Sequence, residues 1–238
     1  MDVLIDAFGW LADGENWRGP DGVPTRLLEH VELTVASVVI ACLIAIPLAL
    51  WLGHIGKGGT LAINVSNVGR AVPTFAVLVL LFLTPLGLSV WSTIIALILF
   101  AIPPILTNTY VGMREVDRDA VDAARGMGMD GMQLLRKVEL PLAAPLLMNG
   151  VRLAAVQVVA TATIAALVAA GGLGRIITSG FGRQDYPQMV AGAMLVAALA
   201  LIVEGLMEWL QHRLDPMRRA RRIRVRRAPD VIEAVTGS

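Results

Sequence analysis

Four long stretches without a charged residue constrain the fold of this chain more than any other feature. They cover residues 33–53, 71–113, 153–174 and 186–203. A helix needs roughly 20 mainly apolar residues to cross a bilayer, so nearly all of them are long enough. Only 16% of the residues are charged, against about a quarter in an average soluble domain. The sequence therefore predicts an all-α, polytopic membrane protein and disfavours a large soluble helical bundle.

The apolar pattern predicts about five transmembrane spans, which lie near 31–52, 62–84, 88–112, 143–170 and 187–210. The run 71–113 is too long for one crossing, and Thr84-Pro85-Leu86-Gly87 supplies turn residues that divide it. Several prolines fall inside these spans, where they can kink a helix: Pro47, Pro73, Pro103 and Pro104.

The distribution of lysine and arginine predicts the orientation of the spans, because cytoplasmic loops carry an excess of both. The N-terminal segment and the loops at 85–88 and 171–186 share one side of the membrane. Their basic residues are Arg18, Arg26, Arg175 and Arg183. The other side has more of them: Lys57, Arg70, Arg114, Arg118, Arg125, Arg136, Lys137, Arg213 and the run at 218–227. We therefore expect the N-terminus outside and the C-terminus in the cytoplasm.

This topology divides the chain into an extracytoplasmic segment (1–30), a transmembrane domain (31–210) with a cytoplasmic loop at 113–142, and a basic cytoplasmic tail (211–238). The first segment has no basic stretch leading an apolar core, so no cleavable signal peptide is expected. Contact with anionic membrane lipid explains the basic run of the tail better than contact with nucleic acid does.

Helix signals gather in the cytoplasmic loop. Asp117 or Asp119 is suited to cap a first short helix, and Gly128 to end it in the left-handed conformation. A face of small residues on this helix would permit close approach of a partner: Ala120, Ala123 and Ala124. An ordinary interfacial loop with a helical turn or two is the alternative.

A second short helix is predicted directly after the first. Asp130 is suited to cap it, and Gln133 stands three residues on, as in a reciprocal capping box. Pro141 is expected to end this helix because its ring removes a hydrogen-bond donor. Pro145 is expected to open the next span in its first turn. Two capped helices on a loop that stands in water favour a docking element.

The loop resembles the signature of importer-type ABC permeases, in which E-A-A, three residues, G, nine residues and I-x-L-P follow one another. This chain has Asp122-Ala123-Ala124, three residues, Gly128, nine residues and Val138-Glu139-Leu140-Pro141, so every spacing agrees. Aspartate for glutamate and valine for isoleucine are conservative departures. The resemblance implies the type I importer permease fold, with a coupling helix that sits in a groove of an ATPase. The implied docking residues are Asp122, Ala123, Ala124, Arg125, Gly126, Gly128, Leu140 and Pro141.

Segments 70–74, 105–113 and 170–174 are similar to the permeases of bacterial osmoprotectant importers, which carry glycine betaine, carnitine, choline or proline betaine. This narrower resemblance implies a multi-pass subunit of the bacterial cell membrane. Its implied partners are two ABC ATPase subunits, a second permease subunit (identical or related), and an extracytoplasmic substrate-binding protein or lipoprotein. ATP and magnesium would be bound by the ATPase, so this chain is expected to be no enzyme and to hold no cofactor.

No catalytic or metal-binding constellation is expected from the sequence. The three histidines, His30, His54 and His212, fall at predicted span ends, where an interfacial role is favoured over metal ligation. The glycines at 171–174 lack the lysine of a phosphate-binding loop.

Polar residues within spans are candidates for the translocation pathway, namely Gln157, Thr161 and Asn108, although helix–helix hydrogen bonding is favoured as their explanation. Arg152 is expected to extend to the cytoplasmic surface, and Glu204 to reach the interface or pair with a basic residue. On the outer loop, topology and the family resemblance suggest docking of a binding protein at Arg175, Arg183 and Asp185.

Three alternatives remain open at this stage. One is an ABC permease for another small solute, such as an amino acid. Another is a secondary transporter driven by an ion gradient, which would be expected to have internal repeats and an ionisable group at mid-membrane; neither is recognised in the sequence. The last is a membrane scaffold that transports nothing.

Overall fold

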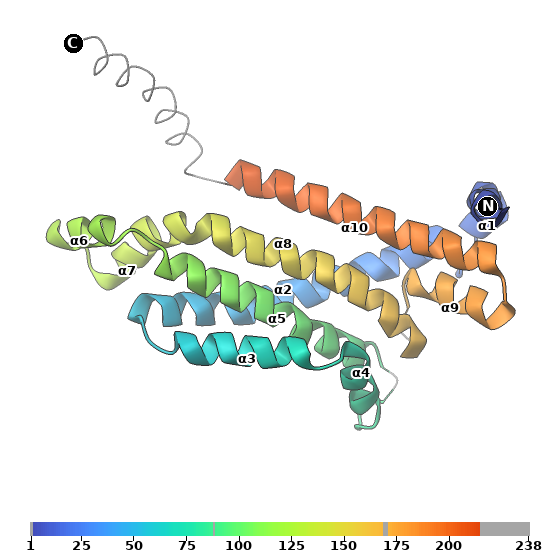
Figure 1. Cartoon of the computed structure of the whole chain (residues 1–238), viewed down its shortest axis with the longest axis horizontal. Coiled ribbons are helices and arrows are strands. Elements are labelled where there is room, and N and C mark those ends of the chain that lie inside the picture. Colours follow the sequence, from blue (N-terminus) through green and yellow to red (C-terminus); the bar gives the residue numbers. More distant parts are fainter. Residues whose placement is uncertain (1, 88, 169–170, 215–238) are drawn as a thin grey trace, which may run out of the picture.

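A computed structural model describes residues 2–87, 89–168 and 171–214, and within these ranges the regular elements are all helices. Four helices are long and apolar enough to cross a membrane. They are α2 (Val23–Ile55), α5 (Val90–Arg114), a continuous helix Gly131–Ala165, and α10 (Tyr186–Leu214). The four run lengthwise through the molecule (Figure 1). The predicted all-α membrane fold is confirmed.

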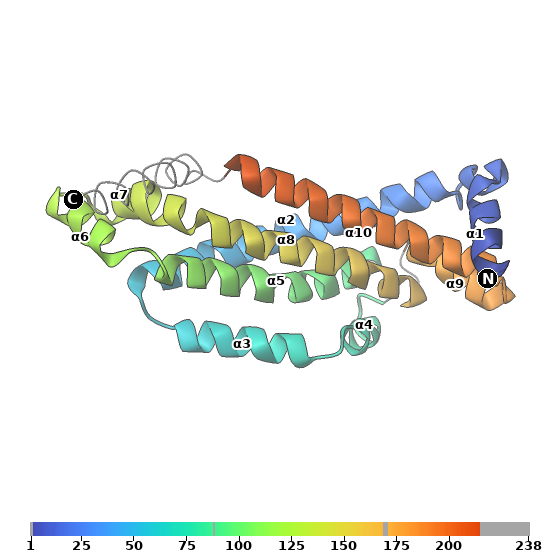
Figure 2. The same ribbon diagram turned by 45° about the horizontal axis from the view of Figure 1, so that its top comes forward.

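The second predicted span is not one helix. It is divided into α3 (Gly59–Ala71) and α4 (Thr74–Phe82). Pro73 disfavours helical geometry at the residue before it, and Val72 is extended, with φ −77° and ψ 126°. α3 runs beside α5, whereas α4 points in another direction in both views (Figures 1 and 2). The prediction of a continuous span at 62–84 was therefore wrong, although α3 and α4 together still carry the chain back along the bundle.

The turn predicted at Thr84-Pro85-Leu86-Gly87 is confirmed. The Gly87 N–H donates to the Thr84 carbonyl at 3.0 Å, and Gly87 has a φ of +54° that suits glycine. Ser89 then caps α5 by accepting a hydrogen bond from the Ser92 N–H. The chain reverses here and enters α5.

The two ends of the bundle carry different short elements. One end, called the α6 end, has α6 (Arg118–Gly126) and α7 (Gly131–Leu134). The opposite end, called the α9 end, has α9 (Gly174–Arg183), α1 (Asp2–Ala12) and the 3₁₀ turn η1 (Gly14–Trp17) (Figure 1). α2 begins eight residues before the predicted start of the first span, and in this added part His30 is buried while Arg26 and Glu29 are partly buried and form an ion pair.

α7 and α8 (Leu140–Ala165) form one helix, joined by a π-helical turn, η2 (Leu135–Glu139). The prediction that Pro141 ends a separate helix was wrong. In η2 the Leu140 N–H donates to the Leu135 carbonyl five residues back, and this wider turn accommodates the proline that follows. Pro145 likewise lies inside α8 and does not open it. A 3₁₀ turn, η3 (Ala166–Val168), follows α8.

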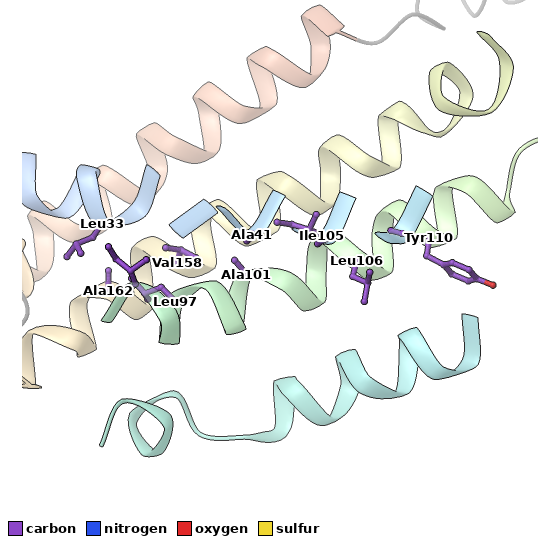
Figure 3. Close-up of a cluster of buried hydrophobic side chains, with 13 residues drawn as sticks. Leu33, Ala41, Leu97, Ala101, Ile105, Leu106, Tyr110, Val158 and Ala162 are labelled. Carbon is purple, nitrogen blue, oxygen red and sulfur yellow. The ribbon is translucent and has the colours of Figure 1, made fainter. Parts of the chain in front are cut away.

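The main core lies between α2, α5 and α8, and Figure 3 shows its side chains meeting among these three helices. Its buried residues are mostly alanine or aliphatic: Leu33, Ala41, Ala45, Ala49, Ile94, Leu97, Ala101, Ile105, Leu106, Tyr110, Ala154, Val158 and Ala162. Glycines allow the closest approaches. A Cβ added at Gly150 of α8 would lie 2.8 Å from the Cβ of Asn108 and from the carbonyl oxygen of Pro104, both in α5.

The predicted basic tail at 211–238 begins inside α10, which continues to Leu214. Residues from 215 onward, including the basic run at 218–227, lie outside the described part of the chain.

Replacing Gly150 with alanine should destabilise the protein. The new methyl group would push α5 away from α8, at a cost of about 1–3 kcal/mol for overpacking. Gly205→Ala in α10 is the matched control, because no atom lies within 4 Å of its added Cβ. That control should be neutral or stabilise by up to about 1 kcal/mol through helix propensity. Thermal unfolding of both variants in detergent provides the measurement, and equal shifts would contradict the close α5–α8 contact.

Candidate functional site

Both helices predicted in the loop at the α6 end are present and capped. Asp117 caps α6 by accepting a hydrogen bond from the Asp119 N–H at 2.9 Å. Asp130 caps α7 by accepting one from the Gln133 N–H at 2.8 Å. Gly128 between them has a φ of +83°. The described hydrogen bonds include only this half of the expected capping box, since none runs from the Gln133 side chain back to Asp130.

α6 has an inner and an outer face. On the inner face Val121 and Ala124 are each 2% exposed, and they pack with Met113 and Val116 of the same chain. We call five exposed residues of α6 and of the turn that follows it the α6 outer face: Asp122, Ala123, Arg125, Gly126 and Gly128. Met127, between the last two, is also exposed. It carries an exposed ion pair between Asp122 and Arg125 at 3.5 Å. A Cβ at Gly126 or Gly128 would meet no atom within 4 Å, so the surface is open there.

Three residues predicted to dock a partner lie away from the α6 outer face. Ala124 points into the chain's own core. Leu140 and Pro141 begin α8 and are half-buried. The predicted small-residue face is therefore divided, with Ala123 outside and Ala124 inside, because a short helix that rests on a bundle must bury one side.

A hydrogen bond that sequence reasoning missed fastens the α6 end to α2. His54 Nδ1 lies 2.5 Å from Glu139 Oε2, although 85 residues separate the two in sequence. Glu139 is only 7% exposed. The sequence analysis placed His54 at an interface, and no local pattern indicates its partner.

A chain of polar contacts crosses from α5 through α8 to α10. Asn149 Nδ2 donates to Asn108 Oδ1 at 3.2 Å, and Arg152 Nη2 to Asn149 Oδ1 at 3.5 Å. Arg152 Nε lies 3.4 Å from Glu204 Oε1, which is an ion-pair contact only, because Nε makes no hydrogen bond within the described residues. The expectation that Glu204 pairs with a basic residue is confirmed. The Arg152 side chain is partly exposed and lies against Glu204, and its extension to the cytoplasmic surface stays a prediction.

The three candidate pathway residues do not meet at one place. Asn108 lies level with Asn149, whereas Gln157 is eight residues further along α8, about 12 Å along the axis. Thr161 is 8% exposed and donates to the Gln157 carbonyl at 2.7 Å. Thr161 thus makes a local hydrogen bond within its own helix.

At the α9 end, α2 holds the glycine-rich loop that follows α8. The Gly172 N–H donates to Glu29 Oε2 at 2.8 Å, and the Leu173 N–H to His30 Nδ1 at 3.2 Å. Since His30 Nδ1 accepts, Nε2 carries the proton and donates to the Val159 carbonyl at 3.0 Å. Gly172 has a φ of +89°, and a Cβ there would lie 2.9 Å from His30 Nδ1, so the position requires glycine.

A polar pocket of about 620 Å³ opens at the α9 end between η1, the start of α2, and α9. Its charged lining residues are Glu15, Arg18, Asp21, Arg26, Arg175 and Arg183. Two of the three residues predicted to dock a binding protein, Arg175 and Arg183, thus share this pocket. The third, Asp185, accepts a hydrogen bond from the Gln188 N–H at 3.0 Å and caps the start of α10.

These features define a multi-pass α-helical membrane protein that presents a short, capped helix at one end. In the parts of the chain that are described, no three His, Cys, Asp or Glu side chains are grouped to hold a metal ion. The model of the family described as "binding-protein-dependent transport system inner membrane component" matches residues 41–216, and the chain belongs to this family.

Relatives at 30% identity or more cover most of the chain. The carnitine transport permease OpuCB of Listeria monocytogenes is 38% identical over 189 residues, 79% of this chain and 86% of that one. The osmoprotectant import permease OsmY of Salmonella typhimurium is 36% identical over 189 residues, 79% and 80% of the two chains. The choline transport permease OpuBB of Bacillus subtilis is 32% identical over 191 residues, 80% and 88%.

Solved structures share the fold. A chain from inward-facing structures of the MetNI methionine ABC transporter matches with a TM-score of 0.69 and 24% identity, over 81% of this chain and 95% of that one. A chain of an amino acid ABC transporter matches with a TM-score of 0.64 and 20% identity, over 80% and 93%. The predicted importer permease fold is confirmed.

Replacing Glu204 with alanine should destabilise the protein by about 1–3 kcal/mol, because the Arg152 guanidinium would lose its counter-charge within a spanning helix. Glu208→Ala, one turn further on, is the matched control. Glu208 and its partner His212, 3.6 Å away, have side chains 55% and 52% exposed, so its loss should change stability by less than about 1 kcal/mol. Thermal unfolding in lipid nanodiscs compares the two. Equal effects would mean that the Arg152–Glu204 contact contributes no more to stability than the exposed Glu208–His212 pair does.

Proposed function

We propose that this chain is the membrane-spanning permease subunit of an ATP-driven importer for osmoprotectants such as glycine betaine, carnitine, choline or proline betaine. The observation that carries the proposal is the capped, outward-facing α6, which has the spacing of a coupling helix in a chain of the binding-protein-dependent transport family. The names of relatives at 32–38% identity support the solute class.

The α6 outer face is the proposed docking surface for a separate ABC ATPase, which would bind and hydrolyse the ATP. The proposal places the α6 end in the cytoplasm and the N-terminus outside. The excess of lysine and arginine in the segments at the α6 end supports this orientation. Closure of two ATPases would move α6, and rocking of the helices would switch access to the solute.

A second permease subunit, identical or related, would complete the pathway. The centre of this chain's bundle is filled by buried residues such as Ala45, Leu97 and Val158, and the described part of the chain leaves no polar passage between α2, α5 and α8. A route for a polar solute would therefore run between two chains. Gln157, Thr161 and Asn108 remain the proposed pathway residues, and Gln157 suits the role well because its half-buried side chain makes no hydrogen bond to other described residues.

The polar pocket at the α9 end is the proposed docking site of an extracytoplasmic binding protein. Arg175 and Arg183 are exposed there and have no carboxylate within 4.0 Å among the described residues. Phe181, 73% exposed, lies beside them. Arginine and aromatic side chains are enriched in protein interfaces, which supports an acidic partner surface. Asp185 contributes indirectly, by capping α10.

Vesicles that contain the complete complex should take up radiolabelled carnitine, choline or glycine betaine only when ATP and binding protein are present. ATP hydrolysis by the ATPase would switch access to the proposed route between the two permease chains, so uptake should stop when ATP is withheld. The measurement is initial uptake with ATP, without ATP, and with a sodium or proton gradient alone. Uptake driven by a gradient without ATP would refute the proposal, and uptake of an amino acid alone would refute the solute class.

Mutations in one proposed docking surface should leave the function of the other surface unchanged. Ala123→Trp should abolish co-purification of the ATPase, because a large side chain would stand on the α6 outer face. Charge reversal of Arg175 and Arg183 to glutamate should abolish stimulation of the ATPase by binding protein and leave ATPase co-purification unchanged. Co-purification and stimulated hydrolysis are measured on every variant.

Each docking variant serves as a control for the other, since they lie at opposite ends of the bundle. Ala12→Trp is a further matched control, because Ala12 is exposed at the α9 end and far from α6 (Figure 1). If Ala12→Trp and Ala123→Trp impaired ATPase co-purification equally, the loss would reflect general misfolding. The proposal that the α6 outer face docks the ATPase would then be refuted.

A further inference from the structure

The contact between His54 and Glu139 joins the last turn of α2 to the helix that follows α6. An imidazole N–H at Nδ1 can donate to a carboxylate oxygen, and His54 Nδ1 lies 2.5 Å from Glu139 Oε2. The other ring nitrogen faces the start of α7, because a Cβ added at Gly131 would lie 3.5 Å from His54 Nε2. One imidazole thus touches both ends of the segment between Gly131 and Glu139.

The π-helical turn brings Glu139 to this position. A π turn holds one residue more than an α-helical turn, so the residues after it are rotated by about 100° relative to α7. π turns are often found at functional sites. Glu139 ends the turn and is buried, while its neighbours Arg136 and Lys137 are exposed. The irregular turn therefore directs one carboxylate inward, to α2.

A second, apolar contact ties the same end of α2 to α6. A Cβ added at Gly53 would lie 2.4 Å from the Met113 Cβ, so α2 and the end of α5 are in direct contact. Met113 belongs to the buried cluster that holds Val121 and Ala124 on the inner face of α6. A displacement of α6 would therefore reach α2 through two contacts, the apolar packing of Met113 on Gly53 and the hydrogen bond between Glu139 and His54. Only the hydrogen bond depends on a fixed direction between its two groups.

The other end of α2 is also held by hydrogen bonds. Glu29 and His30 bind the backbone N–H groups of Gly172 and Leu173, directly before α9. α2 has 33 residues and is about 50 Å long. It lies along the bundle from the α9 end to the α6 end (Figures 1 and 2). One helix thus has specific polar contacts with the proposed ATPase-docking element and with the loop beside the polar pocket.

We propose that α2 transmits movement between the two docking surfaces. In this proposal His54 is the positioning residue, which joins α2 through Glu139 to the segment that carries α6 and α7. The inference rests on the proposed function, since it requires an ATPase at α6 and a binding protein near α9. His54 acts through the position of Glu139 and touches neither solute nor nucleotide.

The test uses the complete complex in vesicles and compares basal ATP hydrolysis with hydrolysis stimulated by carnitine-loaded binding protein. His54→Ala and Glu139→Ala should keep basal hydrolysis, because the α6 outer face is untouched. Stimulation by binding protein, and uptake per ATP hydrolysed, should each fall roughly tenfold, as expected when a buried hydrogen bond that couples two sites is removed. Glu29→Ala, at the other end of α2, should give the same pattern.

Conservative variants distinguish coupling from simple support of the fold. In His54→Asn the side-chain N–H takes nearly the position of Nδ1, and in Glu139→Gln the amide oxygen still accepts. Both should restore most of the stimulation. The double variant His54→Ala with Glu139→Ala should be no worse than either single variant, because the two residues make one contact.

The possible outcomes separate this inference from the proposed function. If the wild-type complex is stimulated and the alanine variants retain the full stimulation and uptake ratio, α2 does not transmit through His54, and the permease assignment stands. If the alanine variants lose basal hydrolysis and ATPase co-purification in the same proportion as stimulation, the pair only supports the docking surface, and the inference is wrong. If the wild-type complex does not respond to binding protein, the proposed function fails and the inference fails with it.

Discussion

The close approach of α5 to α8 is the contact on which the rest of the bundle depends. A Cβ at Gly150 would lie 2.8 Å from that of Asn108, and one at Gly112 would lie 3.0 Å from the Ala143 carbonyl oxygen. Because lipid tails are as apolar as leucine, helices in a bilayer associate through close packing and hydrogen bonds. The glycines allow both here, since the Asn108–Asn149 hydrogen bond forms where the backbones meet. α2 packs against both helices of this pair, and α10 packs against α8.

Features that depend on neighbours in sequence could be predicted, and features that depend on distant residues could not. The long charge-free runs predict spanning helices because hydrophobicity acts locally. Asp117, Asp130 and Gly128 predict the start and end of α6 and the start of α7 because caps act within a few residues. By contrast, 85 residues separate His54 from Glu139, and only the folded chain brings them together.

The errors at two prolines have one physical explanation. Pro73 breaks a predicted span, whereas Pro141 was expected to end a helix and does not. A proline disturbs the helix before it, but its effect depends on whether the preceding turn can widen. At Pro141 the π turn widens and the helix continues; at Val72 the backbone becomes extended. Sequence alone does not reveal which adjustment occurs, because the surroundings of each turn, such as the contact of Glu139 with α2, come from residues distant in the chain.

The filled core of the bundle has a consequence for biogenesis. A membrane that receives single subunits one at a time must keep its ion gradients until each importer is complete. Since alanine and aliphatic side chains such as Ala41, Ala101 and Val158 occupy the space between α2, α5 and α8, the described part of a single chain opens no aqueous hole along that axis. Insertion of one chain by itself should therefore leave the ion gradients undisturbed along that axis.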